Sequence, residues 1–118
     1  MRKLIIAAVL VASLLLAADS NVTGTWSFEV NTGAGSGTPT FEFKQDGSKL
    51  TGKYSGVAGE APVTGTVEGN KIQWEFKVSL GGEEGLVKYQ GTIESSTAMK
   101  GTAEYPGLGS ATWTAKKQ

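Results

Sequence analysis

The sequence predicts an all-β domain, an eight-stranded antiparallel up-and-down meander barrel, preceded by a signal peptide. Apolar residues alternate with polar ones in eight runs after residue 20, which is the period of strands with one buried face. No run in that part of the chain has the period of a helix. Eight strands suffice to close an up-and-down sheet into a barrel. A two-layer β-sandwich of the same strands is the alternative that the alternation leaves open.

A short phrase of the form apolar-x-Gly-x-apolar recurs along the chain. Its copies span residues 50–54, 63–67, 89–93 and 99–103, with a related phrase at 22–26. In each copy the glycine shares the parity of the apolar residues, so in a strand it points to the buried face. A missing side chain on that face lets a strand bend sharply, which favours a sheet that curls until it closes.

The predicted strands follow one another along residues 21–118, which form one predicted domain. They span residues 23–30, 40–45, 50–55, 63–68, 71–79, 87–94, 98–105 and 110–116. The clearest is 71–79, where four apolar side chains alternate with charged or amide side chains. The prolines, Pro39, Pro62 and Pro106, lie at strand edges, where a missing N–H is tolerated.

The connections between these strands differ in length at the two ends of the predicted barrel. The short ones contain residues that favour tight hairpin turns and lie at 46–48, 68–70 and 95–97. The longer ones are rich in Gly or Pro and lie at 31–39, 57–62, 80–85 and 106–109. In a meander, alternate connections lie at the same end. One rim is therefore predicted to be tight and the other to be built from loops.

Residues 1–20 have the features of a cleaved secretory signal. A cationic start at residues 1–3 is followed by an apolar run to about Ala18. That run is shorter than the roughly 20 residues that a membrane-spanning helix needs. Small residues from Ala18 to Ser20 fit a signal-peptidase site, so the mature chain is predicted to begin near Asn21 and to be exported to the periplasm or the medium. An uncleaved anchor is the alternative.

The composition excludes several classes of chemistry. The chain contains no cysteine and no histidine, and its only arginine is Arg2. Thiolate nucleophiles, soft metal ligands and the usual general base near neutral pH are therefore missing, so no enzymatic activity, metal or cofactor is predicted. Acidic and basic residues balance at 11 each and are interleaved, unlike the basic surface of a nucleic-acid-binding protein.

The aromatic side chains of the predicted buried face differ in their height along the barrel. Trp26, Trp74 and Trp113 lie in the middle or toward the tight end, whereas the tyrosines and three phenylalanines lie toward the loop-built rim. A buried phenol ring seeks a partner or water for its hydroxyl, which suits an aromatic pocket with hydroxyls at its mouth. A barrel filled by its own side chains is the alternative. The predicted ligand-binding residues are Phe28, Phe41, Tyr54, Phe76, Tyr89 and Tyr105.

Several short motifs are spaced as in a known group of barrels. Gly24-Thr25-Trp26 opens the first predicted strand, residues 50–54 lie in the third, Trp74 lies in the fifth and Trp113 in the last. This arrangement resembles the calycin pattern of lipocalin-like and avidin-like barrels, which implies that the Trp26 indole packs across the closed end. Residues 44–52 also resemble a hairpin of small uncharacterised exported bacterial domains.

Two departures limit what the resemblance implies about a ligand. Lipocalins place an arginine over the tryptophan near the end of the last strand, where this chain has Lys116 and Lys117, whose ammonium groups lack a planar stacking face. The avidin-like biotin motif is reduced to Asn31 and Ser36. Neither biotin nor a fatty acid held by an internal arginine is predicted.

The predicted function is that of a secreted or periplasmic lipocalin-like domain that binds a small apolar or aromatic molecule at the loop-rimmed barrel mouth, without catalysis. The alternative is a structural or protein-interaction module with a filled interior and no ligand. The predicted partner is a small apolar ligand. Nucleic-acid binding and stable membrane anchoring after cleavage are not predicted.

Overall fold

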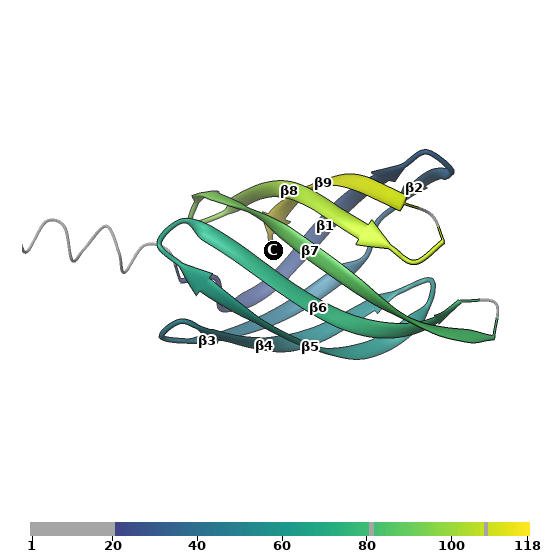
Figure 1. Ribbon diagram of the computed structural model, residues 1–118. Coiled ribbons are helices and arrows are strands. Elements are labelled where there is room, and N and C mark those ends of the chain that lie inside the picture. The colour runs from purple at the N-terminus through teal and green to yellow at the C-terminus, as the bar shows by residue number, and fades with distance from the viewer. Residues whose placement is uncertain (1–20, 81, 108) are drawn as a thin grey trace, which may run out of the picture.

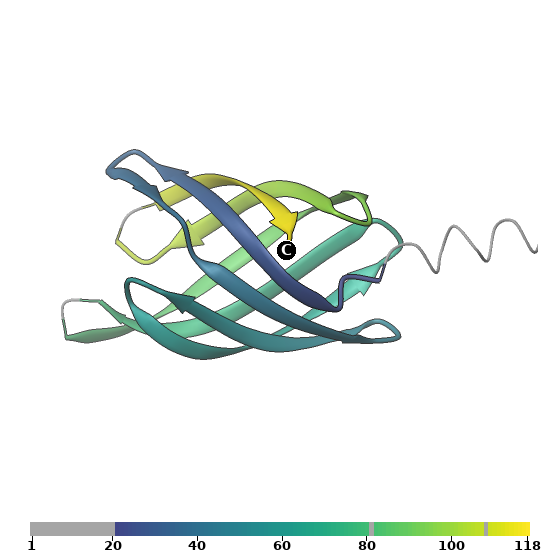
Figure 2. The same cartoon turned by 180° about the vertical axis from the view of Figure 1, so that it is seen from behind.

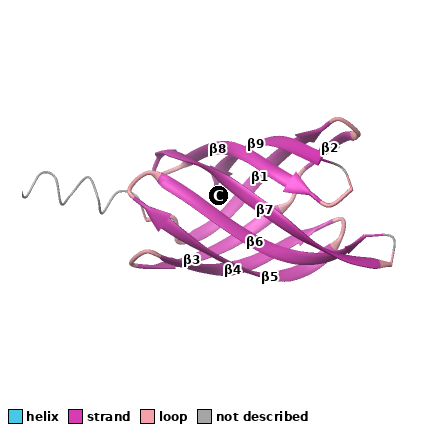
Figure 3. Cartoon of the chain, in the orientation of Figure 1, coloured by secondary structure: helices cyan, strands magenta, loops and turns pink. Residues whose placement is uncertain are grey.

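The computed structural model describes residues 21–80, 82–107 and 109–118, and the predicted signal peptide at 1–20 lies outside this part of the chain. Every regular element in it is a strand (Figure 3). None of its segments is a helix long and apolar enough to cross a membrane. The strands are β1 (Gly24–Thr32), β2 (Gly35–Gly37), β3 (Thr40–Asp46), β4 (Lys49–Gly56), β5 (Gly59–Glu68), β6 (Lys71–Leu80), β7 (Glu83–Ser95), β8 (Ala98–Tyr105) and β9 (Gly109–Lys117).

The strands form one antiparallel sheet that closes into a barrel (Figure 1). Neighbours follow the order β2-β1-β3-β4-β5-β6-β7-β8-β9, and β1 also pairs with β9. This closing ladder runs from Trp26 opposite Lys117 to Thr32 opposite Ala111, and Figure 2 shows the two strands side by side. The predicted eight-stranded up-and-down barrel is therefore confirmed. The sandwich alternative is wrong, because the first and last strands pair.

The extra strand, β2, extends the first hairpin and pairs only with β1. The pairing runs from Thr32 opposite Gly35 to Val30 opposite Gly37, which leaves residues 33 and 34 as the turn. The long connection predicted at 31–39 is therefore wrong. The φ of Gly35 is 143°, a conformation that glycine adopts easily and that allows the chain to return at once as a strand.

Two other connections are also shorter than predicted. β4 and β5 pair as far as Gly56 opposite Gly59, and β6 and β7 pair as far as Leu80 opposite Glu83. The φ of Gly59 is 100° and that of Gly82 is 86°, so glycine again provides the backbone conformation that a tight turn requires. Both rims of the barrel are thus built from hairpins, and the predicted loop-built rim is wrong in this respect.

The inward glycines allow neighbouring strands to approach closely. A Cβ at Gly52 would overlap the backbone oxygen of Glu42, and a Cβ at Gly65 would overlap that of Gln73. A Cβ at Gly91 would likewise overlap the backbone oxygen of Lys100, and a Cβ at Gly101 would overlap that of Gln90. A side chain at these positions would push the strands apart, so glycine is what permits the tight curvature of the barrel wall.

The two ends of the barrel differ in how their strands pair. We call the end that carries the turns at 47–48, 69–70 and 96–97 the sealed rim. We call the opposite end, where the chain passes from β1 to β2, from β4 to β5, from β6 to β7 and from β8 to β9, the split rim. In Figure 1 the hairpins β1–β2 and β6–β7 end well apart at the right, which is the split rim, and Figure 2 shows the same separation from behind.

A proline marks the place where β5 and β6 separate. Their last pair toward the split rim is Thr64 opposite Glu75, and the next hydrogen-bonded pair, two residues further along, would be Pro62 opposite Lys77. The Val67 N–H donates to the Ser48 oxygen, on the side of β5 that faces β4. Because backbone N–H groups alternate in direction along a strand, those of the even-numbered residues of β5 point toward β6. Pro62 would have to donate to β6 and has no N–H, so the ladder ends there.

The other two prolines occupy equivalent places. The last β7–β8 pair toward the split rim is Lys88 opposite Glu104, and the next hydrogen-bonded pair, two residues further along, would set Leu86 against Pro106. Pro39 lies opposite Phe28, accepts a hydrogen bond from its N–H at 3.0 Å and cannot return one, and the chain is not paired as a strand at 38–39 between β2 and β3. Prolines thus divide the wall at the split rim into three groups of strands, β8-β9-β1-β2, β3-β4-β5 and β6-β7.

Candidate binding site at the split rim

The sealed rim is covered by the segment that precedes β1. Val22 and Trp26 are each at most 1% exposed, and the Trp26 indole N–H donates to the Val22 oxygen at 2.9 Å. The Val22 N–H in turn donates to the Gln45 side chain at 2.9 Å. The Trp26 indole therefore lies at the closed end, as the calycin-like pattern implied. An opening for a ligand would therefore lie at the split rim.

The six predicted ligand-binding residues meet in one aromatic cluster. Phe41 occupies its middle, with ring centroids 4.6 Å from Phe28, 5.4 Å from Tyr54, 5.5 Å from Phe76 and 5.3 Å from Tyr89. They come from six different strands, and all are buried except Tyr105, which is half-buried. The six residues are Phe28, Phe41, Tyr54, Phe76, Tyr89 and Tyr105. The structure brings them together, and their rings lie in contact with one another.

Two of these rings stack beside the separation of β5 and β6. Tyr54 and Phe76 have centroids 4.5 Å apart and an interplanar angle of 16°. Tyr54 pairs with Ala61 on the intervening strand β5, and Ala61 is small enough to leave the two larger rings adjacent. Phe76 is the residue that follows Glu75, the last β6 residue paired with β5. The edge of the aromatic cluster thus lies where the wall is interrupted.

Two tyrosine hydroxyls pair at the side of the cluster nearest the split rim. The Tyr89 and Tyr105 hydroxyls form a short hydrogen bond with each other, and their rings are 5.9 Å apart. Burial raises the pKa of the Tyr89 phenol above its ordinary value, and the neighbouring Tyr105 raises it further. Burial also raises the pKa of Tyr105, against an opposing effect of the hydrogen bond from Tyr89. Both phenols therefore stay neutral in the folded protein.

Trp74 belongs to the same cluster, although its position was predicted to be nearer the middle or the closed end. Its indole stacks on Tyr89 at 5.1 Å and lies 5.7 Å from Phe28 and 5.5 Å from Phe41. Trp74 is 2% exposed, and its indole N–H has no hydrogen-bond partner. An unpaired buried donor of this kind costs about 1–3 kcal/mol. The alternation in 71–79 placed Trp74 inside, but no sequence signal identified the missing partner.

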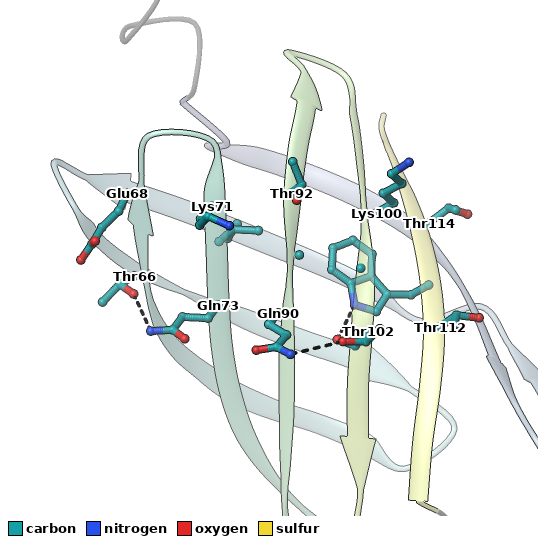
Figure 4. A pocket seen from close by; sticks show the side chains of 14 residues that line it. Thr66, Glu68, Lys71, Gln73, Gln90, Thr92, Lys100, Thr102, Thr112 and Thr114 are labelled. Carbon is teal, nitrogen blue, oxygen red and sulfur yellow. Dashed lines mark hydrogen bonds between the residues drawn. The ribbon is translucent and has the colours of Figure 1, made fainter.

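A second candidate surface lies on the outer wall of the barrel. Two adjoining depressions, of about 780 Å³ and about 590 Å³, share Thr66, Gln73, Gln90 and Thr102. These residues stand opposite one another on β5, β6, β7 and β8 (Figure 4). Gln73 donates to Thr66 at 3.2 Å and Gln90 to Thr102 at 3.4 Å, so each amide donates one hydrogen bond within the row. The sequence analysis did not identify this surface.

The described residues contain few of the side-chain arrangements that catalysis or metal binding uses. Across residues 21–80, 82–107 and 109–118, no three acidic, histidine or cysteine side chains gather as they would around a metal ion. The buried residues of this part of the chain include no charged side chain. The polar groups of the aromatic cluster are neutral phenol hydroxyls and one indole N–H. Such groups can orient an uncharged guest by hydrogen bonds.

Comparisons with solved structures identify barrels of similar shape. A redesigned β-barrel matches with a TM-score of 0.66 and 20% identity over 82% of this chain and 91% of its own. A de novo designed fluorescence-activating β-barrel matches with a TM-score of 0.60 and 16% identity over 86% of this chain and 98% of its own. Another redesigned β-barrel, bound to DFHBI, matches with a TM-score of 0.60 and 15% identity over 82% and 94%.

No family model and no curated protein matches this chain. The identities to the designed barrels are low, so the likeness concerns the fold, and the calycin pattern remains a resemblance of spacing and of the Trp26 position. The chain has the fold of a closed eight-stranded antiparallel barrel, a fold that designed proteins share.

Proposed function

We propose that this protein is an exported, non-catalytic barrel that binds a small, uncharged apolar or aromatic molecule at the split rim. The observation that carries the proposal is the aromatic cluster, in which rings from six strands converge beside a wall that prolines divide into three groups of strands. Apolar surface supplies most of the binding energy in such sites, and a few polar groups fix the orientation of the guest.

One part of the interior wall near the split rim carries small side chains. Ala103 and Ala111 face each other on β8 and β9, and Ala103 also pairs with Tyr89. All three are buried. The large rings on the opposite strands therefore face small side chains near the split rim. A planar guest would enter by parting rings that now touch, and strand groups that are not joined by hydrogen bonds at this end can separate at low cost.

The comparisons support the same kind of function by analogy. Two of the similar designed barrels are bound to DFHBI, and a third is described as fluorescence-activating. Those proteins share the fold with this chain at 15–19% identity. A closed barrel of this fold can therefore bind a small molecule, and the aromatic cluster is where this chain would do so.

The test is a fluorescence titration of the purified protein with N-phenyl-1-naphthylamine, an uncharged probe that brightens in apolar surroundings. Phe76→Leu should weaken probe binding about tenfold, because it removes one ring of the cluster. Phe43→Leu is the matched comparison, because it removes the same atoms at a buried position nearer the sealed rim, on β3 beyond Phe41, and should weaken binding less. Failure of the folded wild-type protein to bind any of the probe would reject the proposal.

A second function rests on the outer wall. The rings of the interior are in mutual contact, and the depressions shared by Thr66, Gln73, Gln90 and Thr102 face outward. These observations favour a protein-interaction module with a filled barrel if no small molecule binds. Gln73→Lys and Gln90→Lys together would then abolish binding of the partner while leaving the barrel folded.

A further inference from the structure

The three tryptophans of the chain differ in one respect. The Trp26 indole N–H donates to the Val22 oxygen and that of Trp113 to the Thr102 oxygen, each at 2.9 Å. The Trp74 indole N–H has no hydrogen-bond partner within residues 21–80, 82–107 and 109–118, although Trp74 is as deeply buried as the other two. Because buried donors in folded proteins are almost always paired, the exception points to a missing acceptor.

The surroundings of Trp74 restrict what that acceptor can be. The indole lies among five aromatic rings whose centroids are 4.9–5.7 Å from that of Trp74, those of Phe28, Phe41, Phe43, Tyr89 and Trp113. Among the polar groups on these rings, the Tyr89 hydroxyl is bonded to Tyr105 and the Trp113 N–H to Thr102. A buried water needs two to four polar partners and would find the Trp74 N–H as the one unpaired group there. An acceptor that belongs to an otherwise apolar molecule suits this environment better, because the rest of the molecule packs against the rings.

We infer that the Trp74 indole N–H is the group that selects the ligand, and that the ligand is a small planar aromatic molecule carrying a hydrogen-bond acceptor, such as a ring nitrogen or a carbonyl. This inference rests on the proposed binding function and specifies its ligand class. The guest lies against the Trp74 and Tyr89 rings, which are stacked with an interplanar angle of 22°. Its acceptor points inward to Trp74, and its apolar edge points to the split rim.

The experiment compares quinoline with naphthalene, which have the same size and shape and differ in one acceptor nitrogen. Binding of each to the purified protein is followed by two-dimensional ¹H–¹⁵N NMR of the three indole N–H groups. Quinoline should bind about tenfold more tightly than naphthalene, the effect of one recovered hydrogen bond. It should also shift the Trp74 indole proton downfield, whereas naphthalene should not.

Two matched variants make the assignment specific. Trp74→Phe keeps an aromatic ring and removes the donor, so it should bring the two affinities within about twofold of each other. Trp113→Phe removes an indole whose N–H is already bonded to Thr102, so it should preserve the preference for quinoline. Circular dichroism of both variants establishes that the barrel is folded before affinities are compared.

The outcomes separate this inference from the proposed function. Equal binding of quinoline and naphthalene by the wild-type protein overturns the role of Trp74 and leaves the binding function intact. Binding of neither molecule, nor of N-phenyl-1-naphthylamine, rejects the binding function and the inference together. A preference for quinoline that survives in Trp74→Phe also overturns the inference, because the donor then lies elsewhere.

Discussion

Gly91 and Gly101 lie opposite each other on β7 and β8, and the Trp113 indole packs over both. A Cβ on either glycine would overlap this indole and a backbone oxygen of the adjoining strand. The tryptophan thus occupies the space that the two missing side chains leave. Two strands and one ring form a single packed unit in this part of the wall.

Gly101→Ala should therefore lower the free energy of unfolding by about 1–3 kcal/mol, the usual effect of forcing an extra group into a packed core. Urea denaturation measures the change. Gly37→Ala is the control, because a Cβ at Gly37 has no atom within 4 Å and its φ is not positive. Equal stabilities for the two variants would contradict the packing described here.

Pro62→Thr should close the separation between β5 and β6. The new N–H would face Lys77, so a further pair of the ladder can form beyond Thr64 and Glu75. Hydrogen exchange of the Lys77 amide should slow by about tenfold or more, since a paired amide exchanges only through local opening. If the separation admits the ligand, the same variant should slow association of N-phenyl-1-naphthylamine. An unchanged exchange rate at Lys77 would mean that proline is not what ends the ladder.

Tyr105→Phe should destabilise the protein by about 1–3 kcal/mol, because it leaves the buried Tyr89 hydroxyl without its partner. Tyr89→Phe should have a smaller effect, since Tyr105 is half-buried and its hydroxyl can turn toward water. The double variant should cost less than the sum of the two single changes, because no unpaired hydroxyl remains. Chemical denaturation of the four proteins gives this comparison, and additive effects would argue against the hydroxyl pair.

The same hydroxyl pair predicts a loss of stability in alkali. The pKa of Tyr89 and that of Tyr105 are raised in the folded state, so folding favours their neutral forms. The unfolded chain releases these protons near pH 10, and above that pH it binds fewer protons than the folded chain. The free energy of unfolding should thus be insensitive to these groups below about pH 10 and fall above it. The fall should be smaller in the variant with both tyrosines changed to phenylalanine.

Export remains a prediction from residues 1–20. Protein recovered from the periplasm or the medium should begin near Asn21, which N-terminal sequencing or intact-mass measurement would determine. Recovery of full-length chain from the membrane fraction alone would favour an uncleaved anchor.

The fold could be predicted because one signal, alternation, determines which face each residue occupies. All eight predicted strands are present, and the glycines that share the apolar parity lie where strands approach closely. The prediction of long rim loops is wrong because the glycines in these segments form tight turns and do not mark irregular chain. Gly35, Gly59 and Gly82 instead provide positive φ for tight turns.

The residues that form the candidate site could be predicted from the sequence, but the arrangement of their side chains could not. The six aromatic residues lie on the inward faces of their strands and toward the same end of the barrel, so their side chains had to meet once the barrel closed. The contact between their rings, the pairing of the Tyr89 and Tyr105 hydroxyls and the unpaired Trp74 N–H depend on side-chain rotamers and on distances across the barrel. Alternation carries no information about either.

The closure of β1 on β9 also brings the last residue back to the first strand. The Gln118 N–H donates to the Thr25 oxygen at 2.9 Å, and its side-chain amide donates to the Ser27 hydroxyl at 2.7 Å. A short linker from residue 118 to residue 21 would therefore span little distance. With new ends opened between residues 57 and 58, a circular permutant would keep every strand pairing, because that turn lies outside the ladders. The barrel is in this sense a cycle of hairpins, and any turn can serve as the place where the polypeptide starts.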